Sequence, residues 1–104
     1  MSKGFGDIMK RAQQMQTQMA RAQQELAAQR VEASVGGGAV VVTADGQQNI
    51  ITITIAPEAI KAGDHEMVQE LVLTGVNQAL QKSRELAARE LGKLTGGLNL
   101  PGMF

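Results

Sequence analysis

The sequence of 104 residues contains no cysteine and only two aromatic side chains, Phe5 and Phe104. The lack of cysteine excludes a disulfide scaffold, a cysteine metal cluster and a thiol nucleophile. Because both phenylalanines lie near the termini, we expect no central aromatic platform for stacking single-stranded bases. His65 is the one histidine, so the chain cannot build a histidine-rich metal site by itself.

Long apolar runs are also missing from the sequence. None approaches the length of about 18 residues that a membrane-spanning helix needs, and residues 1–5 do not open the apolar segment of a signal peptide. We therefore expect a cytoplasmic protein with no membrane partner. With 43% hydrophobic residues, the chain has the composition of one globular domain with a core of its own.

Residues 5–30 contain no proline and, after Gly6, no glycine. Their apolar residues recur at alternating spacings of three and four, which is a heptad pattern and predicts an amphipathic helix. We call these positions the apolar seam: Phe5, Ile8, Ala12, Met15, Met19, Ala22 and Leu26. Because a lone helix of this kind is marginal in water, we expect the seam to pack on its own chain or on a second one.

Three strands are predicted next, over residues 31–35, 39–44 and 49–56. The glycines at 36–38 and the Asp45-Gly46 pair are typical of hairpin connections, so an antiparallel meander is expected. In the last strand the alternation places two sets of side chains on opposite faces, Ile51, Ile53 and Ile55 on one and Ile50, Thr52 and Thr54 on the other. The two edges of such a sheet invite pairing with another chain.

A second long helix is predicted from Asp64, a good N-cap, to about residue 94, after one helical turn that begins at Pro57. Its apolar stripe consists of Val68, Val72, Val76, Leu80, Ala87, Leu91 and Leu94. Gly75 lies within the helix, where we expect it to permit a close approach of another element. The fold class is therefore α+β, with a domain over residues 1–94. Both helices are expected to cover the sheet in part, and the glycines and the proline of residues 95–104 indicate a tail.

The formal net charge is zero, but the charges are segregated along the chain. Residues 1–30 sum to +3, residues 31–70 to −5 and residues 71–104 to +2. Because residues 31–60 contain no basic side chain, any contact with a polyanion must come from a local patch on the helices. The bases also have a plain structural interpretation as solvated helix faces, and Glu85 and Arg89 are spaced for an ion pair along a helix.

No catalytic group of residues is recognisable, so we expect a protein that is not an enzyme and needs no cofactor. The cluster Asp64, His65 and Glu66 has two interpretations, helix capping or a single weak metal site. The glycines at 36–38 are not a phosphate loop, because no Gly-Lys-Ser/Thr follows them and they join two strands.

Residues 6–19, GDIMKRAQQMQTQM, resemble the opening helix of the YbaB/EbfC family of bacterial nucleoid-associated proteins. The resemblance continues in order along essentially the whole chain. Its further matches are the glycines at 36–38, Val42, Thr43, Gly46, the IAPE stretch at 55–58, Asp64, Glu66, Met67, Leu71, Asn77, Gln78, Ala79, Lys82, Gly96, Gly97, Leu98, Pro101, Gly102 and Met103.

This resemblance implies a homodimer in which the two sheets join at the interface and the helices project outward. It also implies binding of double-stranded DNA, organisation of the nucleoid and regulation of gene expression. Proteins of DNA replication or recombinational repair are implied as candidate partners. Carried over to the helices of this chain, the family's DNA contacts fall on Lys10, Arg11, Arg21, Lys82, Arg84, Arg89 and Lys93. Of these, Lys10 and Lys82 lie in matched stretches, and the others are placed by helix only.

Two positions depart from the family pattern. Val41 stands where many members carry a lysine, and Ala56 replaces the usual aspartate before Pro57. The missing lysine removes a phosphate contact from the sheet, so binding is expected to be weak or to use the helices alone.

Two other functions fit the same residues. In the first, the methionine-rich opening helix (Met9, Met15 and Met19) is a flexible apolar surface of a protein-interaction adaptor in DNA replication or repair. In the second, the chain is a purely structural dimer that stabilises a larger assembly.

Overall fold

The computed structural model describes residues 2–95 and has the expected order of one helix, three strands and further helices. The elements are α1 (Ser2–Ala28), β1 (Arg30–Val35), β2 (Val40–Asp45), β3 (Ile50–Ile55), α2 (Pro57–Lys61) and α3 (His65–Thr95). The α+β class is thereby confirmed. The first helix ends two residues earlier than predicted, because Arg30 already begins β1. The tail predicted at residues 95–104 lies outside the described residues, apart from Thr95 at the end of α3.

The strands form an antiparallel sheet in the order β1-β2-β3, which confirms the meander. The glycines at 36–38 join the first two strands with φ angles of 63°, 65° and 93°, a region that favours glycine. Between β2 and β3, Thr43 pairs with Thr52 but Ala44 pairs with Ile50, so Ile51 is an extra residue in a β-bulge. The bulge places Ile50 against the core, and its predicted position on the face opposite Ile53 and Ile55 is wrong.

The core lies between one face of the sheet and α3. Its buried side chains are Ala33, Val35, Val40, Val42, Ala44 and Ala79. The helix can approach closely because Gly75 faces the sheet, where an added Cβ would lie 2.9 Å from Cγ2 of Val42. The buried positions of α3 are Gly75, Ala79, Ser83 and Leu86, so the predicted stripe forms the half-buried margin of this face rather than its centre.

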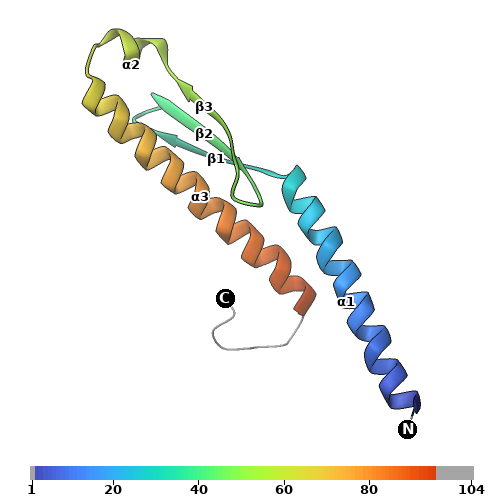
Figure 1. Ribbon diagram of the computed structural model, residues 1–104. Helices are drawn as coiled ribbons and strands as arrows, with labels where there is room; N and C mark the ends of the chain where they lie inside the picture. Colours follow the sequence, from blue (N-terminus) through green and yellow to red (C-terminus); the bar gives the residue numbers. More distant parts are fainter. Residues whose placement is uncertain (1, 96–104) are drawn as a thin grey trace.

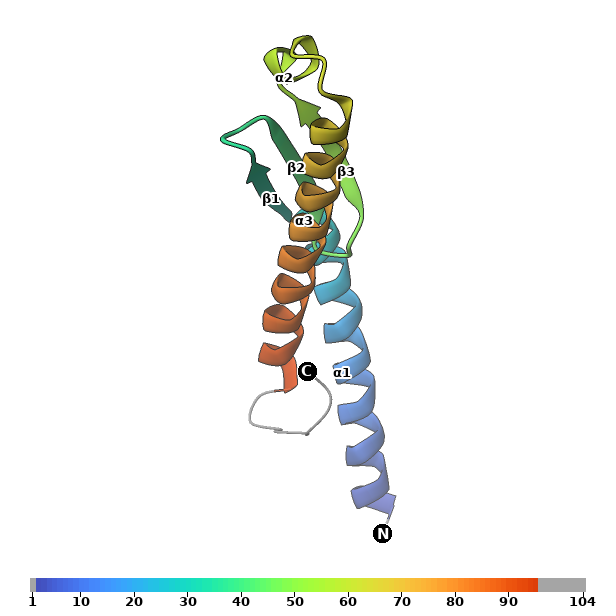
Figure 2. The same ribbon diagram turned by 90° about the vertical axis from the view of Figure 1, so that its left-hand side faces the viewer.

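The first helix does not share in covering the sheet. Leu26 is buried and Met19 and Ala22 are half-buried, whereas Phe5 and Ile8 are exposed. Both long helices run past the sheet on the side away from α2, and α1 extends furthest (Figures 1 and 2). The molecule measures 73 × 25 × 16 Å, with a radius of gyration of 19.8 Å against about 13 Å for a compact domain of this length. The expectation that both helices cover the sheet therefore holds for α3 alone.

Candidate nucleic-acid interface

One face of α1 is polar over about three turns and carries a cation at each end. Lys10 and Arg21 lie about 20° apart around the helix and about 16 Å apart along it. Between them, three glutamines and a threonine line the same shallow concavity: Gln13, Gln14, Thr17 and Gln18. All six side chains are exposed. We call them the polar face of α1, and Arg11 lies beside it, about 100° around the helix from Lys10.

The polar face lies opposite the apolar seam. Helical geometry places Met19 about 160° from Arg21, and the seam is the side on which Leu26 packs against the rest of the molecule. The residues that join α1 to the molecule are therefore on one side, and Lys10 and Arg21 are on the other. This arrangement leaves Lys10 and Arg21 accessible to a large ligand.

The basic residues of α3 are divided between two sides of the helix. Lys82, Arg89 and Lys93 recur at spacings of seven and four and share one side, whereas Arg84 lies on the opposite side. Arg89 and Lys93 belong to the last turns of α3, beyond the end of the sheet (Figure 1). The structure therefore brings Arg89 and Lys93 to the end of the molecule where α1 projects, but not Arg84.

Three of these bases on α3 already have partners. Lys82 Nζ donates to the backbone oxygen of Glu32 at 2.6 Å, Arg84 donates to Gln81 at 2.8 Å, and Lys93 pairs with Glu90 at 3.2 Å. The expected ion pair of Glu85 with Arg89 is not formed, since the Glu85 carboxylate accepts a hydrogen bond from Gln81 instead. Among the bases of α1 and α3 whose side chains the structure describes, Lys10, Arg11, Arg21 and Arg89 have no such partner.

A polar network at the turn between β2 and β3 holds α1 in place. The sequence pattern did not predict this network. The Asp45 carboxylate is almost fully buried and accepts hydrogen bonds from Gln47 N at 2.8 Å, Asn49 N at 3.0 Å and Asn49 Nδ2 at 3.0 Å. Burial by itself raises the pKa of Asp45, but these hydrogen bonds and the charge of Arg30 outweigh it and lower the pKa below 3.8. The signal in the sequence was an aspartate before Gly46, which indicated a turn but not its burial.

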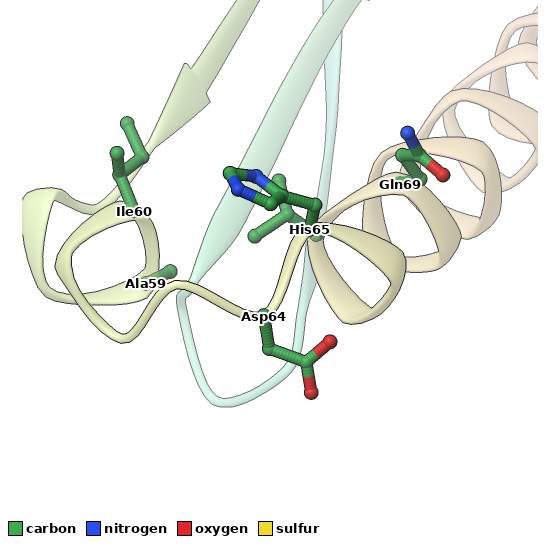
Figure 3. Close-up of a pocket in the computed structure, with 6 residues that line it drawn as sticks. Ala59, Ile60, Asp64, His65 and Gln69 are labelled. Carbon is green, nitrogen blue, oxygen red and sulfur yellow. The ribbon is translucent and has the colours of Figure 1, made fainter.

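The cluster at the start of α3 acts as a helix cap. Asp64 Oδ1 accepts a hydrogen bond from Met67 N at 3.1 Å, as an N-cap does. The neighbouring hollow of about 150 Å³ is lined partly by Ile60 and His65, but the Asp64 carboxylate points away from the imidazole (Figure 3). Residues 2–95 contain no group of three or more side chains placed to hold a metal ion, and no helix in that range could cross a membrane.

Known proteins share the sequence or the fold of this chain. The model of the YbaB/EbfC DNA-binding family matches residues 1–98. A nucleoid-associated protein of Desulforamulus reducens is 52% identical, with 100% of this chain and 99% of the relative covered. One of Ruminiclostridium cellulolyticum is 51% identical, with 97% and 92% covered. The crystal structure of an uncharacterized protein from Helicobacter pylori has the same fold, with a TM-score of 0.79 over 88% of this chain and 97% of that one at 16% identity. Because the family model matches residues 1–98 and these relatives are about half identical over nearly the whole chain, the chain belongs to the YbaB/EbfC DNA-binding family.

Proposed function

We propose that the protein is a non-enzymatic, homodimeric component of the nucleoid that binds double-stranded DNA through its two long helices. The observation that carries this proposal is the polar face of α1. It presents Lys10 and Arg21 without protein partners, on the side opposite the residues that anchor the helix. Organisation of the nucleoid, and regulation of genes through it, are the roles that such binding supports.

The contacts are made with phosphates rather than with bases. Lys10, Arg21 and Arg89 are exposed point contacts suited to phosphate oxygens, which position a protein on DNA without reading its sequence. The sheet adds little to these contacts, because its one basic residue, Arg30, already donates from Nη1 to the backbone oxygens of Ala27 and Gln29. Sequence specificity is therefore low, and affinity depends on how many helix-borne cations reach the duplex together.

The homodimer forms through the β3 side of the sheet. This strand is an edge, paired on one side only, and Ile51 and Ile53 on it are 44% and 45% exposed. Unpaired edge strands and exposed apolar side chains both favour association with a second chain. Two sheets joined at β3 would leave α1 of each copy projecting, which doubles the number of cations available to one duplex.

Fluorescence anisotropy with a random 30-base-pair duplex, titrated at several salt concentrations, tests the proposal. For about six phosphate contacts, log K falls against log salt with a slope near −5. The double variant Lys10→Gln/Arg21→Gln should bring this slope about two units closer to zero for each α1 in contact. The matched control is Arg84→Gln, whose side chain lies on the other side of α3 and should leave the slope unchanged. Saturable binding that does not weaken with salt would contradict the proposal.

The exposed apolar side chains near the start of α1 also favour a second function, that of an adaptor for proteins of replication or recombinational repair. Phe5, Ile8 and Met9 are 68%, 65% and 48% exposed, and no part of residues 2–95 covers them. Charge reversal at Lys10 and Arg11 separates the two functions. It abolishes DNA binding if the first is correct, and it leaves the capture of a protein partner intact if the second is correct.

A further inference from the structure

The direction of α1 depends on a small area of contact. Only its last turns are buried or half-buried, and residues 4–18 are exposed along the projecting part. A helix held in this way needs a specific attachment, because its own side chains supply little packing. The attachment is made by the β2–β3 turn, residues 45–49, which contacts both long helices.

On the α1 side, the turn caps the end of the helix. Gly46 N donates at 2.8 Å to the backbone oxygen of Leu26, one of the last four carbonyls of the helix, which also accepts a longer bond of 3.2 Å from Gln29 N. Gln47 Nε2 donates to the backbone oxygen of Gln23 at 2.8 Å, one turn earlier. These two bonds fix two points along the axis of α1, so they determine its direction as well as its position.

On the α3 side, Gln48 N donates to Ser83 Oγ at 2.9 Å. Ser83 is fully buried among the small residues on which the sheet packs. Asp45 keeps the turn rigid from within through its hydrogen bonds with Gln47 and Asn49. One turn therefore joins the backbone of α1 to a side chain of α3 with little freedom between them.

Gly46 is the residue that this contact requires. An added Cβ would lie 2.6 Å from the backbone oxygen of Leu26 and 2.8 Å from its Cδ2 atom, where no real side chain fits. Because the nearest atom belongs to the backbone, a side-chain rotation cannot relieve the clash. An alanine here must push the end of α1 away from the turn.

We propose that the β2–β3 turn sets the angle between α1 and α3, and thereby the spacing between the cations on the two helices. Gly46 and Gln47 are its positioning residues. They touch no ligand. They act through the angle between the helices, which determines whether Lys10 and Arg21 reach the same duplex as Arg89. The part of this proposal that concerns the spacing of the cations rests on the proposed function. The angle between the helices does not, because it can be measured without DNA.

The angle is measured as a distance between spin labels on the two helices. The chain has no cysteine, so exposed positions on α1 and α3 can be labelled through Gln16→Cys and Ala88→Cys without background. Mixing with excess unlabelled chains leaves one labelled copy per dimer. We expect one narrow distance distribution for the parent protein, a shifted distribution for Gly46→Ala and a broadened one for Gln47→Ala. The matched control is Gly6→Ala, also on α1, where an added Cβ has nothing within 4 Å.

DNA binding is measured on the same variants by the salt dependence of anisotropy. If Lys10 and Arg21 of one α1 disengage, the slope of log K against log salt moves about two units closer to zero. If Gly46→Ala folds and its distance distribution is unchanged, the proposal is overturned. If Gly46→Ala does not fold, the distance distribution of Gln47→Ala decides whether the turn sets the angle. A shifted distance with unchanged DNA binding would overturn the link to cation spacing. If the parent protein binds no duplex, the proposed function fails while the distances still decide the role of the turn.

Discussion

Asp45 shows how much one side chain contributes to this small molecule. Its carboxylate is buried under the β2–β3 turn and accepts three hydrogen bonds, which together with Arg30 hold its pKa below 3.8 despite burial. A pKa lower in the folded state than in the unfolded chain means that the ionised form stabilises the fold. This stabilisation is complete above about pH 4 and is lost as the pH falls through the folded pKa.

We therefore expect the free energy of unfolding to decrease on acidification below about pH 4, and Asp45→Asn to weaken that dependence. At pH 7 the substitution should destabilise the protein by about 1–3 kcal/mol, because one hydrogen bond to a charged acceptor is lost and the others are weakened. Urea unfolding followed by circular dichroism between pH 2 and pH 7 measures both effects, and it suits a chain with no tyrosine or tryptophan. Parallel pH profiles for Asp45→Asn and the parent would show that another carboxylate is responsible.

Local backbone signals could be predicted at this scale, but contacts between distant residues could not. The glycines at 36–38, the cap at Asp64 and the close approach at Gly75 depend on residue type and near neighbours, and the structure confirms them. The bond from Gln48 to Ser83 joins positions 35 residues apart, and nothing in the local pattern indicates it. The bulge at Ile51 was hidden because strict alternation of isoleucines indicates a regular strand.

At the scale of elements, α1 differs most from what its sequence predicts. The heptad pattern of the seam correctly predicted a helix, because periodicity reports local conformation. The same pattern could not show where the seam is covered, since Phe5 and Leu26 occupy equivalent positions and are 68% and 1% exposed. Whether a seam residue is covered depends on where α3 and the sheet end. The positions of these ends are a property of the assembled fold.

The exposed part of α1 should open far more easily than the core. A helix without tertiary packing is marginal in water, so backbone amides of residues 4–16 have little protection, whereas those near Ala79 open only with the whole fold. Hydrogen exchange followed by mass spectrometry should show residues 4–16 exchanging at least about 100-fold faster than residues 75–86. Equal protection in the two segments would mean that another surface covers the seam.

At the scale of the whole molecule, the exposed apolar area points to assembly. Ile51 and Ile53 lie on an edge strand outside the buried core, so the isolated chain leaves both in contact with water. Sedimentation at micromolar concentration should give a species of about 22 kDa, twice the chain mass of 11.0 kDa. The double variant Ile51→Lys/Ile53→Lys should sediment as a monomer, because it places charges within the apolar contact that the two isoleucines would make.

The control for this experiment is Thr54→Lys, which places the same charge on the other face of β3. It should remain dimeric if the apolar face forms the contact. An 11 kDa parent protein would contradict the dimer, and a dimer that survives the double variant would place the interface elsewhere. The family resemblance already implied a dimer, but the strand that forms its interface became a specific prediction only with the structure.

The attachment of α1 at one end also makes it a lever. Its 27 residues extend about 40 Å, so a tilt of about 10° at Leu26 would displace the far end by about 7 Å, or two base-pair steps of about 3.4 Å. Arg21, one turn from the pivot, would barely move, whereas Lys10 would travel several times as far. A rigid pivot is thus needed to keep the outer cation on its phosphate, whereas the inner one tolerates small changes of angle. The precision required of the β2–β3 turn would then follow from the length of a helix rather than from the chemistry of its side chains.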